Sequence, residues 1–120
     1  MAFALSQEVG DFTRSPTETI IDELDRPFVV RSVSGKVSWA GGGGDALLNV
    51  LIEIQGPGKH RKIRGATNDQ DGRFRIRHVP QGVYRFKATL NGYQSVMGTI
   101  VVSKDAPKSN EVLIEMHYGT

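Results

Sequence analysis

Three histidines are the side chains of this sequence best suited to bind a metal ion or transfer a proton near neutral pH. They are His60, His78 and His117, which stand far apart in the chain, and none belongs to a His-x-His element. The chain has no cysteine, which excludes disulfides, zinc–thiolate sites and a cysteine nucleophile. Because this spacing forms no recognisable ligand cluster, we expect no catalytic residue, no metal site and no cofactor.

Two carboxylates near an expected turn, those of Asp69 and Asp71, are candidate calcium ligands. An EF-hand loop requires acidic residues at alternate positions and a glutamate six residues after its glycine, but His78 stands at that position. The pair Asp71-Gly72 is instead typical of a hairpin turn, where glycine adopts the left-handed backbone conformation. We therefore interpret this segment as a structural turn.

Basic residues form the clearest charge pattern of the chain. Alternating cations occur on two neighbouring segments, Arg73, Arg75 and Arg77 on the first and Arg85 and Lys87 on the second. If the two segments are strands that pair through a turn at residues 79–82, all five cations share one sheet face. Like charges directly opposite one another destabilise a sheet. We expect compensation by water and salt, by an acidic part of the chain, or by an external polyanion.

The N-terminal region supplies an acidic counterpart, because residues 1–27 contain six acidic and two basic side chains. Within it, Ser15 and Glu18 have the spacing of a capping box at the start of a helix. Pro27 limits this helix to about residues 16–25. We expect a short amphipathic helix with one apolar stripe. In one alternative this helix docks across the basic strands, or across those of a neighbouring molecule, and Glu18, Asp22, Glu23 and Asp25 pair with arginines. The stripe consists of Ile20, Ile21 and Leu24.

From residue 28 onward the apolar residues follow the period of two that is typical of half-buried strands. Turn signals divide this part into seven expected strands, at about residues 33–39, 48–54, 61–67, 73–77, 84–90, 93–103 and 110–118. Their regular spacing favours a sandwich over alternating strands and helices. We expect residues 31–118 to form one all-β domain and residues 1–30 to form a helix-bearing extension.

Aromatic residues and the direction of individual side chains bear on binding. Trp39 has the parity of the inward-facing residues of its strand, so its side chain is expected to be buried in the core. If it stands at the open end of the strand, it forms with Tyr93 an aromatic platform on which a carbohydrate can stack.

Tyr84 combines a ring that fills the core with a hydroxyl that can fix a neighbouring loop. Leu48 has inward parity on the second expected strand.

Five short motifs in a fixed order carry a resemblance to a known family. They are SGKV at residues 34–37, LNVLIEI at 48–54, TNDQDGRF at 67–74, VPQGVY at 79–84 and NGY at 91–93. Together they resemble the carboxypeptidase regulatory-like domain, a transthyretin-like (prealbumin-like) β-sandwich, over about residues 33–116. The resemblance implies a non-catalytic accessory module that is attached to larger, commonly extracytoplasmic proteins.

Related folds with chemistry of their own fit the sequence less well. Collagen-adhesin B-type repeats are similar in layout and join a lysine to an asparagine with the help of a glutamate. Here the candidate reactants are Lys36 and Asn110, but Ala88 occupies the position of that glutamate, so we expect no such bond. Intradiol dioxygenases contain a stretch comparable to residues 69–74, but their His-x-His iron ligands have no counterpart here.

The sequence thus predicts a seven-stranded transthyretin-like (Ig-like) sandwich that serves as an accessory or structural binding module of a secreted, periplasmic or cell-surface protein. Its expected partners are other protein domains. The alternative is a carbohydrate- or polyanion-binding module that uses the cations of residues 73–77 and 85–87. Nucleic acid is disfavoured because no aromatic residues alternate with these cations. No apolar stretch approaches the ~18 residues of a membrane-spanning helix, and residues 1–5 do not match a signal sequence.

Overall fold

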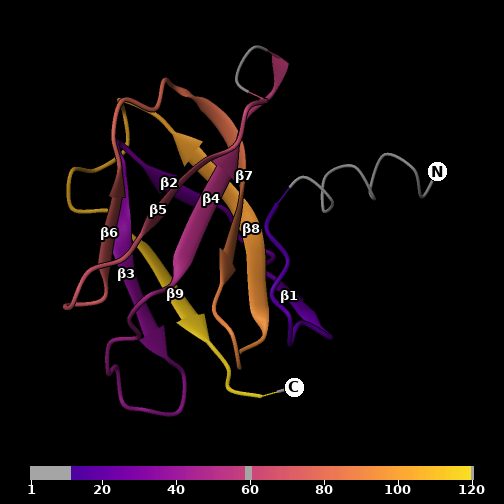
Figure 1. Ribbon diagram of the computed structural model, residues 1–120. Helices are drawn as coiled ribbons and strands as arrows, with labels where there is room; N and C mark the ends of the chain where they lie inside the picture. Colours follow the sequence, from indigo (N-terminus) through magenta and orange to yellow (C-terminus); the bar gives the residue numbers. More distant parts are fainter. Residues whose placement is uncertain (1–11, 59–60, 120) are drawn as a thin grey trace.

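Two β-sheets packed face to face form the described part of the protein, residues 12–58 and 61–119 of a computed structural model (Figure 1). The larger sheet contains β1 (Ile21–Glu23), β2 (Phe28–Val30), β4 (Leu51–Gln55), β5 (Arg64–Thr67), β7 (Gly82–Thr89) and β8 (Ser95–Val102). The smaller sheet contains β3 (Val33–Trp39), β6 (Arg73–Ile76) and β9 (Val112–Met116). The predicted all-β sandwich is therefore confirmed, and the seven predicted strands correspond to β3 through β9.

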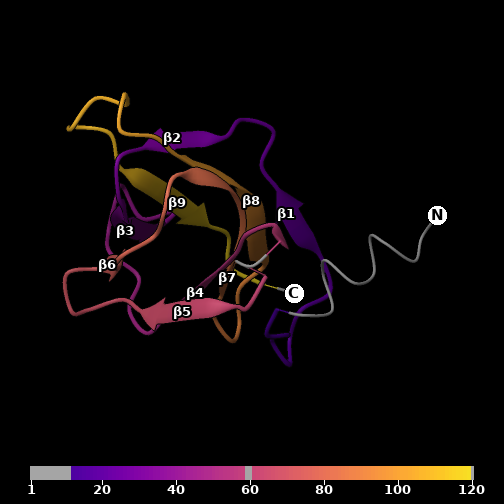
Figure 2. The same cartoon turned by 90° about the horizontal axis from the view of Figure 1, so that it is seen from above.

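The strand order places β7 and β8 in the interior of the larger sheet and β3 at the centre of the smaller one. The larger sheet has the order β1-β8-β7-β4-β5, with β2 also paired to β8, and the smaller sheet has the order β6-β3-β9. Both β1 and β2 run parallel to β8, whereas β7 is antiparallel to β8 and to β4. Seen from above, the two sheets approach one another at β5 and β6 and enclose the core (Figure 2).

The period-two patterns of the sequence become the inner faces of this sandwich. On β9, Ile114 and Met116 are buried while the intervening residues face solvent. Burying one such side chain stabilises the fold by about 1.5–3 kcal/mol, so these rows favour packing of the two sheets. The prediction for Tyr84 is also confirmed, because its ring is buried and its hydroxyl donates to the carbonyl oxygen of Pro80 at 2.8 Å.

The turn before β6 has a structural role, as predicted, but the predicted hairpin is wrong, because β5 belongs to the larger sheet and β6 to the smaller one. Gly72 has a φ of 78°, a conformation that favours glycine, and a Cβ at this position would lie 2.7 Å from that of Ala46. One carboxylate oxygen of Asp69 accepts hydrogen bonds from the backbone N–H groups of Asp71 at 2.8 Å and Arg73 at 3.0 Å. Asp69 thus holds the tight loop that leads the chain into β6.

The predicted helix at residues 16–25 is wrong. The segment forms a turn at residues 16–17 and then the strand β1, and Ile20 is 55% exposed instead of part of a docked stripe. Ser15 closes the turn, because its carbonyl oxygen accepts the N–H of Glu18 at 3.1 Å. An isolated helix shorter than about 12 residues is marginal in water, whereas the edge of β8 provides backbone hydrogen-bonding groups for an extended chain.

The second predicted strand begins later in the structure than in the prediction. β4 starts at Leu51, and Leu48 is 43% exposed, so its predicted inward position is wrong. Asn49 has a φ of 65°, which interrupts the extended backbone between Leu48 and Val50. Leu47 packs against the core instead.

Residues 21–30, which the sequence assigned to an extension, complete the larger sheet. Val30 is fully buried, and its carbonyl oxygen accepts the N–H of Ser103 at 2.9 Å. The Asn110 side chain donates to the carbonyl oxygen of Val29 at 2.9 Å. Further upstream, Phe12 is only 4% exposed. Within the two described stretches, no helix has the length and apolarity that crossing a membrane requires.

We predict that a chain beginning at residue 31 is much less stable than one beginning at residue 12. The shorter chain lacks the buried side chains of Phe12 and Val30 and leaves the edge of β8 unpaired. Each buried side chain contributes about 1.5–3 kcal/mol, and whole domains have only about 5–15 kcal/mol of stability. Guanidinium unfolding followed by circular dichroism should show a large decrease in the midpoint. Equal midpoints would contradict a structural role for this segment.

Candidate functional site: a basic surface on the smaller sheet

The prediction that five cations share one sheet face is wrong. Arg73 and Arg75 lie on β6 of the smaller sheet, and Arg77 follows directly, whereas Arg85 and Lys87 lie on β7 of the larger sheet. The chain between β6 and β7 crosses from one sheet to the other instead of forming a hairpin. Arg64 fixes this crossing, because its guanidinium donates to the carbonyl oxygens of Arg77 and His78.

Lys87 points away from the core, as its parity predicts, but it is fully buried beneath the N-terminal segment. Its ammonium lies 2.8 Å from Oε1 of Glu18, a distance that makes an ion pair although the groups are not aligned as a hydrogen bond. The Ser95 hydroxyl donates to the same carboxylate oxygen at 2.5 Å. Glu53, opposite Lys87 on β4, accepts hydrogen bonds from the backbone and hydroxyl of Thr13 at 2.9 and 3.0 Å.

Of the alternatives for compensating the cations, pairing with acidic residues near the N-terminus occurs on β7. Besides the pair of Glu18 and Lys87, Glu23 accepts a hydrogen bond from Arg85 at 2.7 Å. The segment makes these contacts as an extended chain along the larger sheet. It therefore neutralises the cations of β7, whereas the cations of β6 lie on the other sheet.

Glu18 remains ionised in this setting. Burial alone would raise the pKa of its carboxyl, but the Lys87 ammonium, the Ser95 hydroxyl and the backbone of Ser15 outweigh burial and hold the pKa below its ordinary value of 4.5. Removing one partner of a buried ion pair costs about 3–5 kcal/mol, because the remaining charge stays buried. The folded state consequently requires an anionic group beside Lys87.

The arginines of β6 form the charged outer face of the smaller sheet. In the antiparallel register, Arg75 lies opposite Ser34 and Arg73 lies opposite Lys36. Phe74 and Ile76 alternate with them and are buried. We call this face the basic surface and define it by its cationic residues, Arg31, Lys36, Arg73, Arg75 and Arg77.

Two arginines of the basic surface are unpaired within the described chain. Arg73 forms a salt bridge with Glu111 at 2.9 Å, and Arg31 donates from Nε to the carbonyl oxygen of Ala106. The side chains of Arg75 and Arg77 are exposed, and neither makes an ion pair or hydrogen bond with another residue of ranges 12–58 and 61–119. These two guanidinium groups are available to a ligand.

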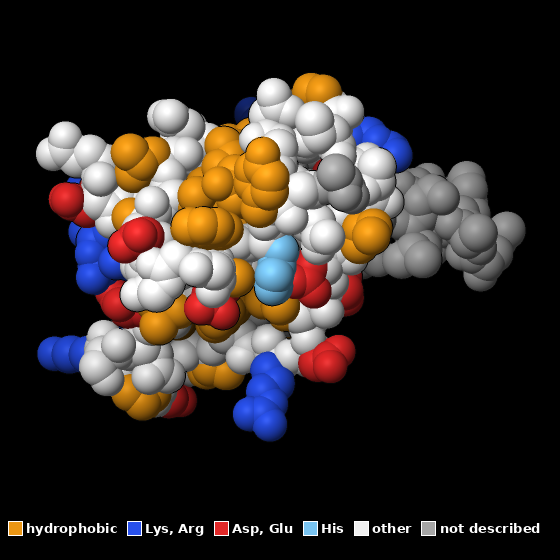
Figure 3. Space-filling view, turned by 90° about the horizontal axis from the view of Figure 1, so that it is seen from below, with side chains coloured by type: hydrophobic (Ala, Val, Ile, Leu, Met, Phe, Trp, Pro, Cys, Tyr) orange, Lys and Arg blue, Asp and Glu red, His pale blue; other side chains and the backbone are white. Residues whose placement is uncertain are grey.

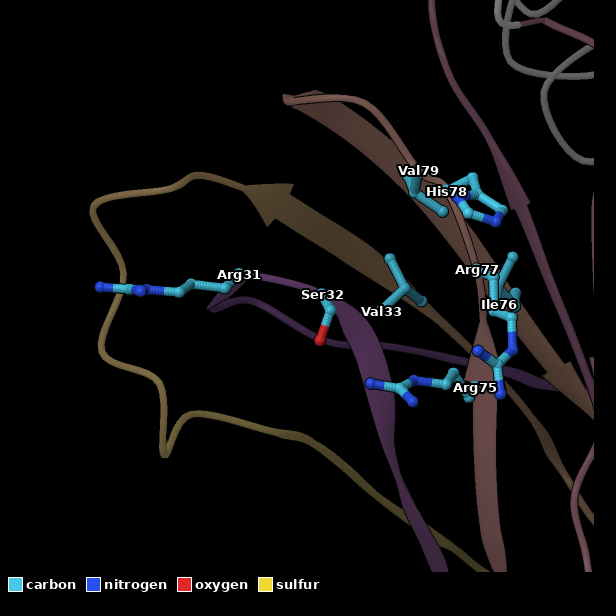
Figure 4. A pocket seen from close by; sticks show the side chains of 8 residues that line it. All are labelled: Arg31, Ser32, Val33, Arg75, Ile76, Arg77, His78 and Val79. Carbon is cyan, nitrogen blue, oxygen red and sulfur yellow. The ribbon is translucent and has the colours of Figure 1, made fainter.

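A hollow of about 280 Å³ lies beside the unpaired arginines and is bordered by Ser32 and His78. Figure 4 shows Arg75 and Arg77 on the β6 side of this hollow, whereas Arg31 extends away from them toward the loop before β9. A second hollow, of about 380 Å³, shares Arg75 and reaches Ser34 and Glu111. Arg75 thus borders both hollows.

This geometry suits an anionic ligand with more than one charged group. A guanidinium presents a planar fork of donors that matches a carboxylate or phosphate. Arg75 lies on β6, and Arg77 follows this strand directly. Residues two apart in extended backbone are separated by about 6.6–6.8 Å, so the two arginines can contact two separate anionic groups. Short serine side chains on the neighbouring strand leave both guanidinium groups accessible.

Sequence reasoning missed Arg31 and Ser32 as parts of this surface. They precede β3, and only the antiparallel pairing of β3 with β6 brings them next to Arg77. A period of two predicts which side of a strand a residue faces. It does not indicate which strand lies beside it, so the sequence contained no signal for this juxtaposition.

The predicted aromatic residues lie at the opposite end of β3. Trp39 is the last residue of that strand and is 39% exposed, so the prediction that it lies in the core is wrong. Tyr93 is half-buried and meets Tyr118 edge to face, with ring centroids 5.4 Å apart. The ranges 12–58 and 61–119 contain no group of three or more His, Asp or Glu side chains that could hold a metal ion, and His60 lies outside them.

Comparison with known protein families shows which family this chain belongs to. The family model for the carboxypeptidase regulatory-like domain matches residues 32–116. The chain belongs to this family. The matched range contains every strand from β3 to β9 and leaves β1, β2 and Glu18 outside. A carboxypeptidase regulatory-like domain is generally a non-catalytic β-sandwich module, and no curated protein sequence matches this chain.

Among solved structures, the domain is similar to chlorocatechol 1,2-dioxygenase from Pseudomonas putida. The two chains are 8% identical, the match covers 91% of this chain and 69% of the dioxygenase chain, and the TM-score is 0.50. At this identity the likeness concerns the fold alone. Function depends on the residues that a fold carries, and unrelated sites are found on the same fold.

We predict that Glu18→Gln destabilises this regulatory-like domain by about 3–5 kcal/mol at pH 7, because the buried Lys87 loses its charged partner. The pKa of Glu18 is lowered by folding, so its stabilising effect is present above about pH 4.5 and is lost as the pH falls through the folded value. Urea unfolding at several pH values should therefore show the two proteins converging in acid.

The matched control is Glu23→Gln, which removes an exposed ion pair with Arg85. Exposed pairs contribute about 0–1 kcal/mol, so this variant should unfold close to the original protein at every pH. A Glu18→Gln effect as small as that of the control would show that the buried pair does not stabilise the fold.

Proposed function

We propose that this carboxypeptidase regulatory-like domain is a non-catalytic accessory module of a secreted or cell-surface protein. In this role it binds an acidic segment of another protein domain on its basic surface. The observation that carries the proposal is the pair of exposed guanidinium groups, Arg75 and Arg77, for which the described chain supplies no acidic partner.

The distribution of acidic residues supports an external partner. On the larger sheet, the chain's own carboxylates neutralise Lys87 and Arg85. On the smaller sheet, Glu111 pairs with Arg73, and the next two arginines along β6 remain exposed. Like charges close together repel one another, so an anionic partner at this position relieves repulsion between Arg75 and Arg77 as well as forming new contacts.

The extent of the surface favours a protein segment over a long polyanion. A polyanionic chain binds through many cations in a continuous array, but the β7 cations are on the other sheet and Glu111 stands beside the array. An extended peptide has side chains on one side every second residue. Two such acidic side chains match the spacing of Arg75 and Arg77. An acidic glycan, which has the same charge chemistry, is distinguished by experiment.

We predict that an extended peptide with alternating glutamates binds the domain and that Arg75→Glu/Arg77→Glu weakens this binding at least tenfold. Tenfold corresponds to about 1.4 kcal/mol, a small effect for two lost charge-assisted contacts. Fluorescence anisotropy of the labelled peptide at physiological and raised salt gives the affinity. The same measurement with heparin reports on the glycan alternative.

The control carries the same change of charge at two other exposed arginines, as Arg14→Glu/Arg26→Glu. Peptide binding by this control should stay within about twofold of the original, since screening weakens distant exposed charges. Equal losses in both double variants would show that net charge, and not the basic surface, determines binding. Retention of heparin alone, with no peptide affinity, would replace the protein partner with an acidic glycan.

A further inference from the structure

Exposed aromatic rings lie at the end of the sandwich opposite the hollow that borders Arg75 and Arg77. Trp39 ends β3 opposite Met116 of β9, and the N–H of Ala40 donates to the carbonyl oxygen of Met116 at 3.0 Å. Two residues beyond Met116, Tyr118 is 72% exposed. Figure 3, which views this end from below, shows hydrophobic side chains gathered on the surface beside a histidine. The register therefore places an indole and a phenol ring at the ends of neighbouring strands.

The indole of Trp39 is held in place by a glycine-rich turn. A Cβ on Gly42 would lie 2.4 Å from Cε3 of the ring, so only glycine permits the backbone to lie this close. The turn is closed by hydrogen bonds from the N–H of Trp39 to Asp45 at 2.9 Å and from the N–H of Gly42 to Trp39 at 3.0 Å. The backbone thus supports the ring, while 39% of the residue stays exposed.

Tyr118 is fixed from the other side by the turn before β8. It forms a bridge with Tyr93, and the two rings meet at 87°. The N–H of Gly119 donates to Gly92 at 2.9 Å, and the N–H of Gln94 donates to His117 at 3.0 Å. Both exposed rings are therefore positioned before any ligand arrives, which reduces the entropy lost on binding.

Asp45 and His117 are polar residues whose backbones adjoin those of Trp39 and Tyr118. Asp45 closes the Trp39 turn and is exposed. His117 precedes Tyr118, and its Nδ1 lies 3.9 Å from a carboxylate oxygen of Asp22. A carboxylate accepts hydrogen bonds from hydroxyl groups, and an imidazole can donate hydrogen bonds to them or accept hydrogen bonds from them. The carboxylate of Asp45 also disfavours an anionic ligand, because like charges repel.

We propose that this aromatic end is a binding site for a neutral saccharide, separate from the basic surface. The apolar C–H face of a pyranose ring stacks on Trp39 and Tyr118, and its hydroxyl groups bind the polar side chains at the edge. We choose a saccharide because the indole and phenol rings are flat and amphipathic. Such rings suit a ligand that is apolar on one face and polar at its rim. The site is about one strand length from Arg75 and Arg77, so it does not depend on the proposed function.

Trp39 is the only tryptophan of the chain, so its fluorescence reports directly on this site. We expect at least one of cellohexaose, maltohexaose, xylohexaose, mannohexaose and chitohexaose to change the emission saturably. A concentration of about 10 mM is tenfold above a Kd of about 1 mM. Tyr118→Ala keeps the fluorescent reporter and should weaken binding at least tenfold, while Trp39→Ala should abolish binding measured by calorimetry.

Two controls separate this site from the rest of the surface. Leu113→Ala removes an exposed aliphatic side chain from β9, and Arg75→Glu/Arg77→Glu changes the basic surface. Both should bind the saccharide as the original protein does. The proposal is overturned if none of the five saccharides changes the emission, or if Tyr118→Ala, folded by circular dichroism, binds with unchanged affinity.

Discussion

The buried ion pair between Lys87 and Glu18 organises much of this structure. A charged ammonium removed from water requires a nearby anion. β7 places Lys87 on the outer face of the larger sheet, where the carboxylate of Glu53, opposite it on β4, is hydrogen-bonded to Thr13. Glu18 provides the anion only if the N-terminal segment crosses that face. The segment then continues as β1 and β2 along β8 and covers an otherwise open edge. One electrostatic requirement thus accounts for an element that lies outside the family range.

The same arrangement leaves the two faces of the sandwich with different charge properties. Carboxylates from the N-terminal segment are committed to the larger sheet, where they neutralise β7. The smaller sheet keeps the exposed arginines of β6, and its far end keeps exposed aromatic rings. A module of this kind offers chemically distinct surfaces at the two ends of one strand, β3. The rigid sheet holds both surfaces in a fixed relation to one another.

Several polar side chains that could be mistaken for ligand-binding residues have structural roles in this fold. Asp69 receives backbone N–H groups of its own turn, and Arg64 fixes the crossing between sheets. Asn68 accepts the N–H of Val50 at 2.8 Å and so joins the turn to β4. Similarity to a dioxygenase in fold is consistent with this picture, because a shared scaffold carries no catalytic residues by itself.

The sequence by itself determined the strands from β3 to β9, the turn at Gly72 and the inward rows, because these follow from period-two patterning and local backbone preference. It also indicated the family through the order of its turn motifs. Only the tertiary structure decided which strands became neighbours. It therefore separated Arg85 and Lys87 from β6, buried Lys87 despite its outward parity, and exposed Trp39 despite its inward parity. It also drew residues 21–23 into a strand, because the edge of β8 supplied hydrogen-bonding partners that no local pattern encodes.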